Sequence, residues 1–361
     1  MITREWPLLP VYGTALVFSA FQAALLGELA NPWWAAFMLL VLFGIMMLAS
    51  FAVVRHADCL AEIFGEPYGT LILTFAITGI EVMMIAAVML TGPAVSTTAR
   101  DTMFAVIMIV FNGMAGVALL VGGLRYNEQV YNLQGANAFL AVIVPLAVLG
   151  LVLPNFTSAP DATLSVLHEG FLMLMSVALY AVFLAIQTLR HKHFFTDNGE
   201  AEEKPPPITD LRPAAYHATL LVLYIVPIVL LSKKIAVPID FGVHVLGAPE
   251  ALVGFLVAVL IMSPESLTAL RATLANQMQR SINLLLGSVL ASISLTIPAV
   301  LAIGLLTDRL VVLGLAPVDM LLLLLTLASA LITYASGRTN ILQGVIHILL
   351  FCAYIVLIFD R

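Results

Sequence analysis

Long apolar runs alternate with short polar loops along the whole chain, and this alternation predicts its elements. Each run approaches the roughly 20 residues that an α-helix needs to cross about 30 Å of hydrocarbon. Helices satisfy their own backbone hydrogen bonds in lipid, so the predicted fold class is an all-α polytopic membrane protein with about 11 transmembrane helices. The predicted spans are 8–28, 33–55, 68–91, 102–124, 137–157, 164–189, 214–232, 250–270, 282–306, 310–335 and 340–359.

One long polar stretch, residues 190–213, divides the spans into two sets. It contains three consecutive prolines and clustered acids, which are typical of a solvated linker. Without the first helix, five spans lie on each side, and an odd number means that the second set is inverted in the membrane relative to the first. The predicted domains are an N-terminal transmembrane helix (1–32), a first five-helix repeat (33–189), the cytoplasmic linker (190–213) and a second five-helix repeat (214–361).

Composition excludes a soluble protein. The chain is 62% hydrophobic and only 10% charged, whereas soluble proteins average about 25% charged residues. The two cysteines, Cys59 and Cys352, lack metal-type spacing, which argues against a disulfide scaffold and a zinc site. We expect membrane lipid as a partner, no nucleic acid and no cofactor; the pattern gives no oligomeric state.

The distribution of Lys and Arg predicts the orientation, because these residues are enriched in cytoplasmic loops. We interpret the first apolar run as a retained helix, with the N-terminus and central linker inside and the C-terminus outside. The inside set is then Arg4, Arg55, Arg125, Arg190, Lys192, Lys204, Arg212, Arg271, Arg280 and Arg338, and the smaller outside set is Arg100, Lys233, Lys234, Arg309 and Arg361. The predicted location is a bacterial-type inner membrane.

The two halves share a pattern of glutamates. Glu66 and Glu81 are 15 residues apart, as are Glu250 and Glu265, and each pair brackets the second helix of its repeat. Fifteen helical residues rise about 22 Å and turn the second position by a net ~60°. Each helix would therefore carry one acid near its mouth and one deep inside. Glu66 and Glu250 are candidate entrance acids, or simply residues that suit a helix end.

Glu81 and Glu265 fall within long apolar spans, where a charged side chain costs roughly 2.5–3.5 kcal/mol. Desolvation favours the protonated acid and a bound cation favours the carboxylate. These two residues are therefore the predicted cation- and proton-binding (metal) sites. Because Pro264 cannot donate a helical hydrogen bond, we expect Pro264 and Gly79 to loosen the two helices in mid-membrane.

Small polar residues near the two acids are candidate oxygen ligands for a hard cation such as Ca²⁺, Na⁺ or K⁺. Such residues are also common at helix–helix contacts in membranes, and we expect about half of them to serve packing alone. The candidate ligands are Thr78, Asn112, Ser263, Ser288 and Ser292.

Five segments give the chain a resemblance to a known family: "VRHADCLAEIFGEPYGTLIL", "GFLVAVLIMSPESL", "QRSINLLLGSVLASISLTIP", "GGLRYNEQVYN" and "SGRTNILQGVIH". Over nearly its whole length the chain resembles the cation/proton exchangers of the calcium–cation antiporter superfamily. The resemblance implies a first helix followed by two inverted five-helix repeats. It also implies that the central acids Glu81 and Glu265 carry the cation and exchange it for protons.

The chain departs from the calcium/proton members of that family near both acids. Those members place an Asn shortly before each acid, whereas the stretches here read "AITGIEV" and "IMSPESL", and Ala291 stands where a Gln often follows Gly-Ser. Ca²⁺, Na⁺ and K⁺ therefore all remain candidate ions.

The expected function is secondary active antiport by alternating access, exporting a cation in exchange for protons. A passive cation channel with acidic pore residues is the alternative. The chain lacks the metalloprotease, serine-protease and prenyltransferase motifs of intramembrane enzymes, so we expect no enzymatic activity.

Overall fold

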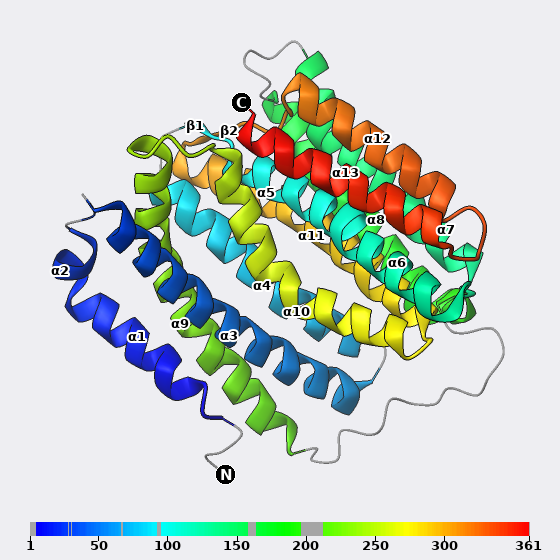
Figure 1. Cartoon of the computed structure of the whole chain (residues 1–361), viewed down its shortest axis with the longest axis horizontal. Coiled ribbons are helices and arrows are strands. Elements are labelled where there is room, and N and C mark those ends of the chain that lie inside the picture. Colours follow the sequence, from blue (N-terminus) through cyan, green and yellow to red (C-terminus); the bar gives the residue numbers. More distant parts are fainter. Residues whose placement is uncertain are drawn as a thin grey trace. The chain divides into compact units, whose positions relative to one another are not determined.

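The computed structural model describes residues 5–27, 29, 31–65, 68–91, 95–157, 164–195 and 212–360, and it confirms the all-α membrane fold (Figure 1). In the described part of the chain, eight helices are long and apolar enough to span a membrane. Three shorter apolar helices, at Leu8–Ala20, Thr74–Leu90 and Pro317–Thr333, complete a set that agrees with the eleven predicted spans.

The elements follow one another along the chain with few interruptions. They are α1 (Leu8–Ala20), α2 (Gln22–Leu26), α3 (Pro32–Phe64), α4 (Tyr68–Thr91), β1 (Val95–Ser96), α5 (Thr98–Ile107), η1 (Met108–Met114), α6 (Ala115–Tyr126), α7 (Leu133–Ala147), η2 (Val148–Val152), η3 (Leu153–Phe156), α8 (Val166–Ala185), η5 (Ile186–Arg190), η6 (Lys192–Phe194), α9 (Ala214–His244), α10 (Ala251–Leu274), α11 (Met278–Thr307), β2 (Leu310–Val311), α12 (Pro317–Thr333) and α13 (Ile341–Phe359).

Several span boundaries differ from the prediction. The first span is divided at Phe21 into α1 and α2. Helices α3 and α9 continue well beyond the predicted ends at 55 and 232, because a helix can carry polar residues past the apolar core of the membrane. The predicted span 310–335 is shortened, because residues 310–311 pair as strand β2 and the helix starts at Pro317, where proline suits the first helical position.

The helices pack into two compact units, each of which includes helices from both predicted repeats. Unit 1 comprises Met1–Ala94 and Pro207–Pro264. Unit 2 comprises Val95–Pro206 and Glu265–Arg361. The grouping by packing does not test the repeat boundaries, which stay a prediction. In unit 1, α3 packs against α4 and α9, α4 packs against α9, and α1 packs against both α3 and α9.

In unit 2, α11 packs against α5, α7 and α8, while α6 packs against α13. Glycines allow the α6–α13 pair to approach at the level of the backbone. A Cβ atom on Gly344 would lie 2.5 Å from the Leu120 backbone nitrogen, and one on Gly116 would lie 3.0 Å from that of Ile348. Small residues serve this purpose in membranes, where close packing rather than the hydrophobic effect holds helices together.

Unit 2 joins its connecting segments at two separate ends. At one end, Gln129 and Thr339 exchange two hydrogen bonds of 3.0 and 2.9 Å, and the Asn132 backbone N–H donates to Gln279. At the other end, β1 pairs with β2 in parallel and Arg100 donates to the Gly314 carbonyl. This grouping agrees with the predicted alternation of spans, since loops expected on one side are bonded to each other.

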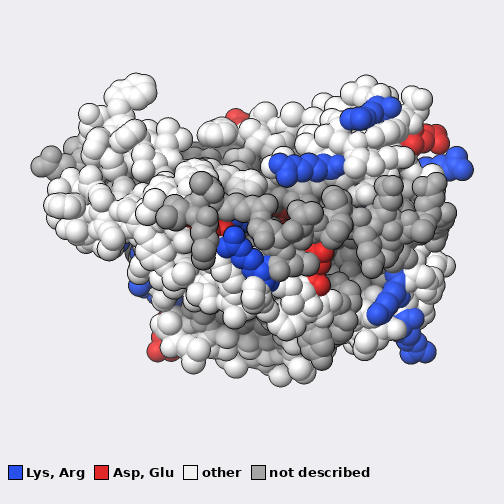
Figure 2. Space-filling model, turned by 90° about the horizontal axis from the view of Figure 1, so that it is seen from below, with Lys and Arg blue, Asp and Glu red and all other residues white. Residues whose placement is uncertain are grey.

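Large apolar side chains cover much of the exposed surface. Trp33 and Leu306 are each 84% exposed and Leu9 is 73% exposed. Figure 2 shows one face on which Lys, Arg, Asp and Glu form only small, separate groups among uncharged residues. A protein surrounded by water would not expose so many large apolar side chains, and lipid is the solvent that suits them.

The α6–α13 contact predicts a steric effect of Gly344→Val. The new side chain would clash with the backbone of Leu120, which cannot change rotamer as a side chain can. We therefore expect the free energy of unfolding to fall by roughly 1–3 kcal/mol. The measurement is the thermal unfolding midpoint of the detergent-purified protein. Gly170→Val in α8 is the matched control, because a Cβ atom there would meet nothing within 4 Å. Equal midpoints for the two variants would contradict the packing argument.

Candidate functional site

Glu81 occupies the middle of α4 in unit 1. It lies 13 residues after Tyr68, the first residue of this 24-residue helix, which places it about 20 Å along the axis. Its side chain is only 1% exposed. Thr78 is also buried and, being three residues earlier, lies on the same face of the helix. The structure therefore places a carboxyl group and a hydroxyl group together deep inside an apolar helix.

Glu265 occupies a similar depth in α10, 14 residues after Ala251 in a helix that is also 24 residues long. Its half-buried carboxyl group contacts the hydroxyl of Ser288 on α11, within unit 2. The Ser288 hydroxyl also lies 2.8 Å from the Leu284 carbonyl oxygen, one helical turn earlier. The sequence-predicted acid and one of its predicted oxygen ligands are thus in direct contact.

A hydroxyl group has one proton to donate and two lone pairs to accept with. When Glu265 is protonated, its O–H donates to Ser288, and Ser288 donates to the Leu284 carbonyl. When Glu265 is ionised, Ser288 turns and donates to the carboxylate. The same hydroxyl therefore stabilises both forms of the acid, which suits a group that alternates between a proton and a cation.

The other predicted ligands have varied surroundings. The Ser263 hydroxyl donates to the Val259 carbonyl of its own helix. Ser292 is buried one turn after Ser288 on α11, and so lies on the same face as Ser288. The roles of these residues as ligands stay a prediction.

Asn112 lies in η1, a π-helical segment between α5 and α6, and its amide is held from both sides. Its Nδ2 donates to Thr326 Oγ1 at 2.8 Å, and its Oδ1 lies 2.9 Å from His347 Nδ1. His347 is held in turn by Thr333, whose Oγ1 is 3.0 Å from Nε2. Single turns of π-helix often occur at functional sites. This buried network joins η1 to α12 and α13.

The remaining predicted residues are located as follows. Gly79 and Pro264 lie inside continuous helices, so the structure shows no break at either; loosening during transport stays a prediction. A Cβ atom on Gly79 would meet nothing within 4 Å, so packing does not require the glycine. Glu250 is exposed immediately before α10, and Glu66 lies outside the described residues.

Two networks of hydrogen-bonded polar side chains in the structure were not predicted from the sequence. His347, Thr326 and Thr333 surround Asn112, and a second network joins Glu5, Arg55, His56, His217 and Tyr224. Sequence reasoning could not find them because most of the bonded residues are more than 50 positions apart. Only the presence of polar side chains within apolar spans gave a signal.

Comparison with known proteins yields one family and several relatives. The family model described as "Sodium/calcium exchanger protein" matches residues 9–189 and 216–359. The sodium-potassium/proton antiporter ChaA of Escherichia coli is 41% identical over 325 residues, covering 89% of this chain and 88% of ChaA. The protein y4hA of Sinorhizobium fredii is 40% identical over 352 residues, covering 97% and 94%. Among solved structures, native YfkE superposes with a TM-score of 0.76 at 13% identity, covering 98% of this chain and 100% of YfkE.

The Glu265–Ser288 contact predicts that Ser288→Ala weakens cation binding. A hydrogen bond to a charged group contributes about 1.5–3 kcal/mol and one between neutral groups about 0.5–1.5 kcal/mol. The ionised acid therefore loses roughly 1–1.5 kcal/mol more than the protonated acid, and we expect the half-saturating cation concentration to rise roughly 5- to 10-fold. Equilibrium binding of ²²Na⁺ or ⁴⁵Ca²⁺ to the purified protein measures it. Ser294→Ala is the control, because the buried Ser294 hydroxyl has no hydrogen-bond partner in the described part of the chain. If both variants bind like the wild type, Ser288 is a packing residue.

Proposed function

The chain belongs to the sodium/calcium exchanger protein family, and we propose that it is a secondary active antiporter that exports cations in exchange for protons by alternating access. The observation that carries the proposal is the burial of the Glu81 carboxyl group in the middle of a membrane-spanning helix. Glu265, at a similar depth in α10, is the second acid of the mechanism.

A buried acid of this kind has two stable states, protonated and cation-bound. A carboxyl group removed from water is stabilised by taking up a proton or by binding a cation, and the two ligands compete for the same oxygens. The protein crosses between its inward- and outward-open states with either load. Binding a cation on one side and protons on the other then converts an inward proton gradient into cation export.

We propose Na⁺, K⁺ and Ca²⁺ as the transported ions, because all are hard cations that prefer oxygen ligands. The similarity to a sodium-potassium/proton antiporter supports the two monovalent ions in particular. Glu81 and Glu265 bind the ion, and Thr78, Asn112, Ser263, Ser288 and Ser292 are the proposed sources of further oxygen ligands. A panel of these cations in transport vesicles at two pH values orders their preference.

A proton-flux assay separates an antiporter from a passive channel. In everted membrane vesicles energised to an acidic interior, adding Na⁺, K⁺ or Ca²⁺ is expected to release protons and dissipate the pH gradient. The fluorescence of a pH-gradient dye follows this release. Cation flux without accompanying proton movement would identify a channel and reject the proposal.

Neutral substitution of the two central acids is the direct test of the site. Glu81→Gln and Glu265→Gln keep the side-chain volume but hold neither a negative charge nor a transferable proton, so we expect each to reduce exchange to the background. Glu250→Gln is the matched control, because Glu250 is exposed before α10, and we expect it to keep most of the activity. Membrane insertion of each variant is checked by immunoblot. Retained exchange in either central variant would refute the assignment.

We propose a bacterial inner-membrane location with the N-terminus and central linker in the cytoplasm and the C-terminus outside. In unit 2, the end that contains the Gln129–Thr339 contact carries most of the basic residues, as expected of a cytoplasmic end. Its basic residues are Arg125, Arg190, Lys192, Arg271, Arg280 and Arg338, while Arg100 and Arg309 lie toward the β1–β2 end.

Cysteine labelling tests this orientation. In a variant lacking Cys59 and Cys352, a membrane-impermeant maleimide added to intact spheroplasts is expected to label Thr307→Cys and to leave Ser336→Cys unlabelled until the membrane is permeabilised. Both positions are exposed in the structure, so access depends on the side of the membrane alone. The reverse labelling pattern would invert the proposed topology.

A further inference from the structure

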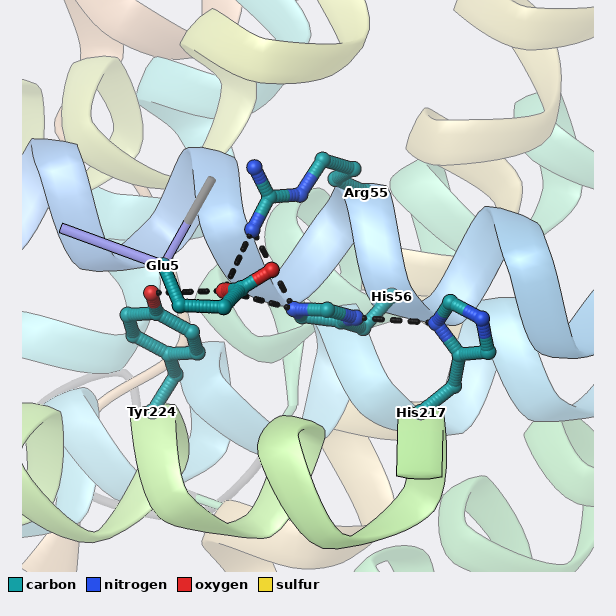
Figure 3. A network of polar contacts seen from close by, with 5 residues as sticks. All are labelled: Glu5, Arg55, His56, His217 and Tyr224. Carbon is teal, nitrogen blue, oxygen red and sulfur yellow. Dashed lines mark hydrogen bonds and ion pairs between the residues drawn. The ribbon is translucent and has the colours of Figure 1, made fainter. Parts of the chain in front are cut away.

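A buried polar network fastens three segments of unit 1 (Figure 3). Glu5, which precedes α1, places its Oε2 2.7 Å from Arg55 Nη2, 3.3 Å from His56 Nε2 and 3.1 Å from the Tyr224 hydroxyl. On the far side of the His56 ring, Nδ1 lies 3.0 Å from Nδ1 of His217. Arg55 and His56 belong to α3, and His217 and Tyr224 belong to α9. The network therefore joins the N-terminal segment to α3 and α9.

The contact between the two histidines depends on how many protons they hold. A hydrogen bond between two Nδ1 atoms needs one N–H and one lone pair, so both rings neutral, or one ring charged, preserve it. With both rings charged, two N–H groups and two positive charges face each other across 3.0 Å. Both histidines are at most 4% exposed, so water does not screen this repulsion. The second proton must break the contact.

Glu5 supplies a fixed negative charge beside the pair. Burial raises the pKa of Glu5, but the positive charges of Arg55 and His56 and the hydrogen bond from Tyr224 lower it by more, so the pKa lies below its ordinary value of 4.5. Because this pKa is lowered, ionised Glu5 stabilises the folded state at every pH above the ordinary carboxyl pKa. That stabilisation is lost as the pH falls through the lowered pKa. Near neutral pH Glu5 therefore stays ionised. Histidine is the side-chain type that ordinarily gains its charge just below neutral pH, and the two rings are the histidines of this network.

The surroundings of the pair contain few other titratable groups. The Tyr216 ring contacts both histidines edge-on, the Tyr224 ring stacks on His56, and Arg212 lies 4.6 Å above the Tyr216 ring. On α1, Tyr12 is directed to the Leu223 carbonyl. Among the described side chains of α4, Glu81 is the charged one. On α3, Asp58 and Cys59 follow His56. Glu5 and Arg55 both contact His56 directly, and Arg55 Nη2 lies 3.2 Å from His56 Nε2.

We infer that the His56–His217 pair is a regulatory proton-binding site, separate from the transport acids, which releases α3 from α9 when it holds two protons. The inference rests on the proposed function. Both α3 and α9 pack against α4, the helix that carries Glu81. Separating them disturbs the support of α4 and lowers transport. Under the proposed orientation the buried pair lies near the cytoplasmic ends of α3 and α9, so the site slows proton import when the cytoplasm becomes acidic.

The first test compares pH profiles of cation/proton exchange in proteoliposomes in which the cytoplasmic-side pH is varied from 5.5 to 8.5. His217→Asn places an amide where Nδ1 was, and an amide can donate to or accept from His56 whatever its protonation. We expect the wild type to lose about tenfold in rate on the acid side and His217→Asn to lose less than twofold. His244→Asn is the matched control, since His244 is an exposed histidine of the same helix.

A second variant separates a proton site from a merely structural contact. Glu5→Gln removes the negative charge that favours charged histidines, so the acid inhibition is expected to move to lower pH. A structural role alone predicts the opposite, because a weakened network would give way at higher pH. Profiles of Glu5→Gln and His217→Asn that superpose on the wild type would overturn the inference.

Hydrogen exchange provides a readout that does not depend on transport. In the purified protein, amides near His217 at the start of α9 are expected to exchange at least tenfold faster at pH 5.5 than at pH 8, after correction for intrinsic rates, in the wild type and in His244→Asn but not in His217→Asn. Equal protection in wild type and His217→Asn overturns the regulatory site. Absence of exchange transport in the wild type rejects the proposed function and leaves the hydrogen-exchange result to decide the proton site.

Discussion

Keeping a carboxyl group away from water is costly, and the helix packing of this protein must accommodate that cost. Glu81 is almost completely buried in the middle of α4, and an uncompensated charge at such a depth costs at least about 2.5–3.5 kcal/mol. For a protein whose net stability is of the order of 5–15 kcal/mol this is a large cost, and a proton or a cation that neutralises the acid removes it. The fold must therefore deliver one or the other to the acid at every stage.

The helices around each acid are held by extensive packing and polar contacts, while the acids themselves can change their protonation state. In unit 1, α3 and α9 contact each other and α4, and the Glu5–His217 network fastens their ends. In unit 2, α11 is packed among α5, α7 and α8 and presents Ser288 to Glu265. The amide contacts at one end and the strand pair at the other fix the connecting segments. A hydroxyl group that donates or accepts then adjusts to the load at little cost.

Much of the fold could be predicted from the sequence, because lipid imposes a simple rule. Apolar length gives the helices, and the predicted start of α4 at residue 68 and end of α13 at residue 359 agree with the structure. The predicted helix boundaries were wrong where apolar length does not determine the end of a helix. The final turns of α3 were not predicted, because they contain polar residues. The apolar segment 310–316 was predicted as helix but contains a strand and a loop, because hydrophobicity alone does not distinguish a helix from other buried structure.

The contacts around the candidate site could be predicted only in part. Position within an apolar run led to Glu81 and Glu265, and the search for oxygen-bearing residues near the acids led to Ser288, which contacts Glu265. Their roles in transport stay a prediction. The partners of Asn112 could not be predicted, because Thr326 and His347 are 214 and 235 residues away in the chain. The same is true of His56 and His217, which are 161 residues apart. Polar contacts between distant helices depend on rotation about each helix axis, and a hydrophobic pattern constrains that rotation weakly when the helix is apolar on every side.

Coupling between cation and proton follows from the same burial cost. If each bare carboxylate adds about 3 kcal/mol to the barrier for crossing the membrane cycle unloaded, each slows that crossing more than a hundredfold, since 1.4 kcal/mol is a factor of ten. Two such acids, Glu81 and Glu265, suppress an unloaded return by more than 10⁴-fold. The empty carrier is thereby the slow species and the loaded carrier the fast one. In the proposed mechanism, the low dielectric around buried Glu81 and half-buried Glu265 couples the cation to the proton, because a crossing with either acid bare and charged is slow.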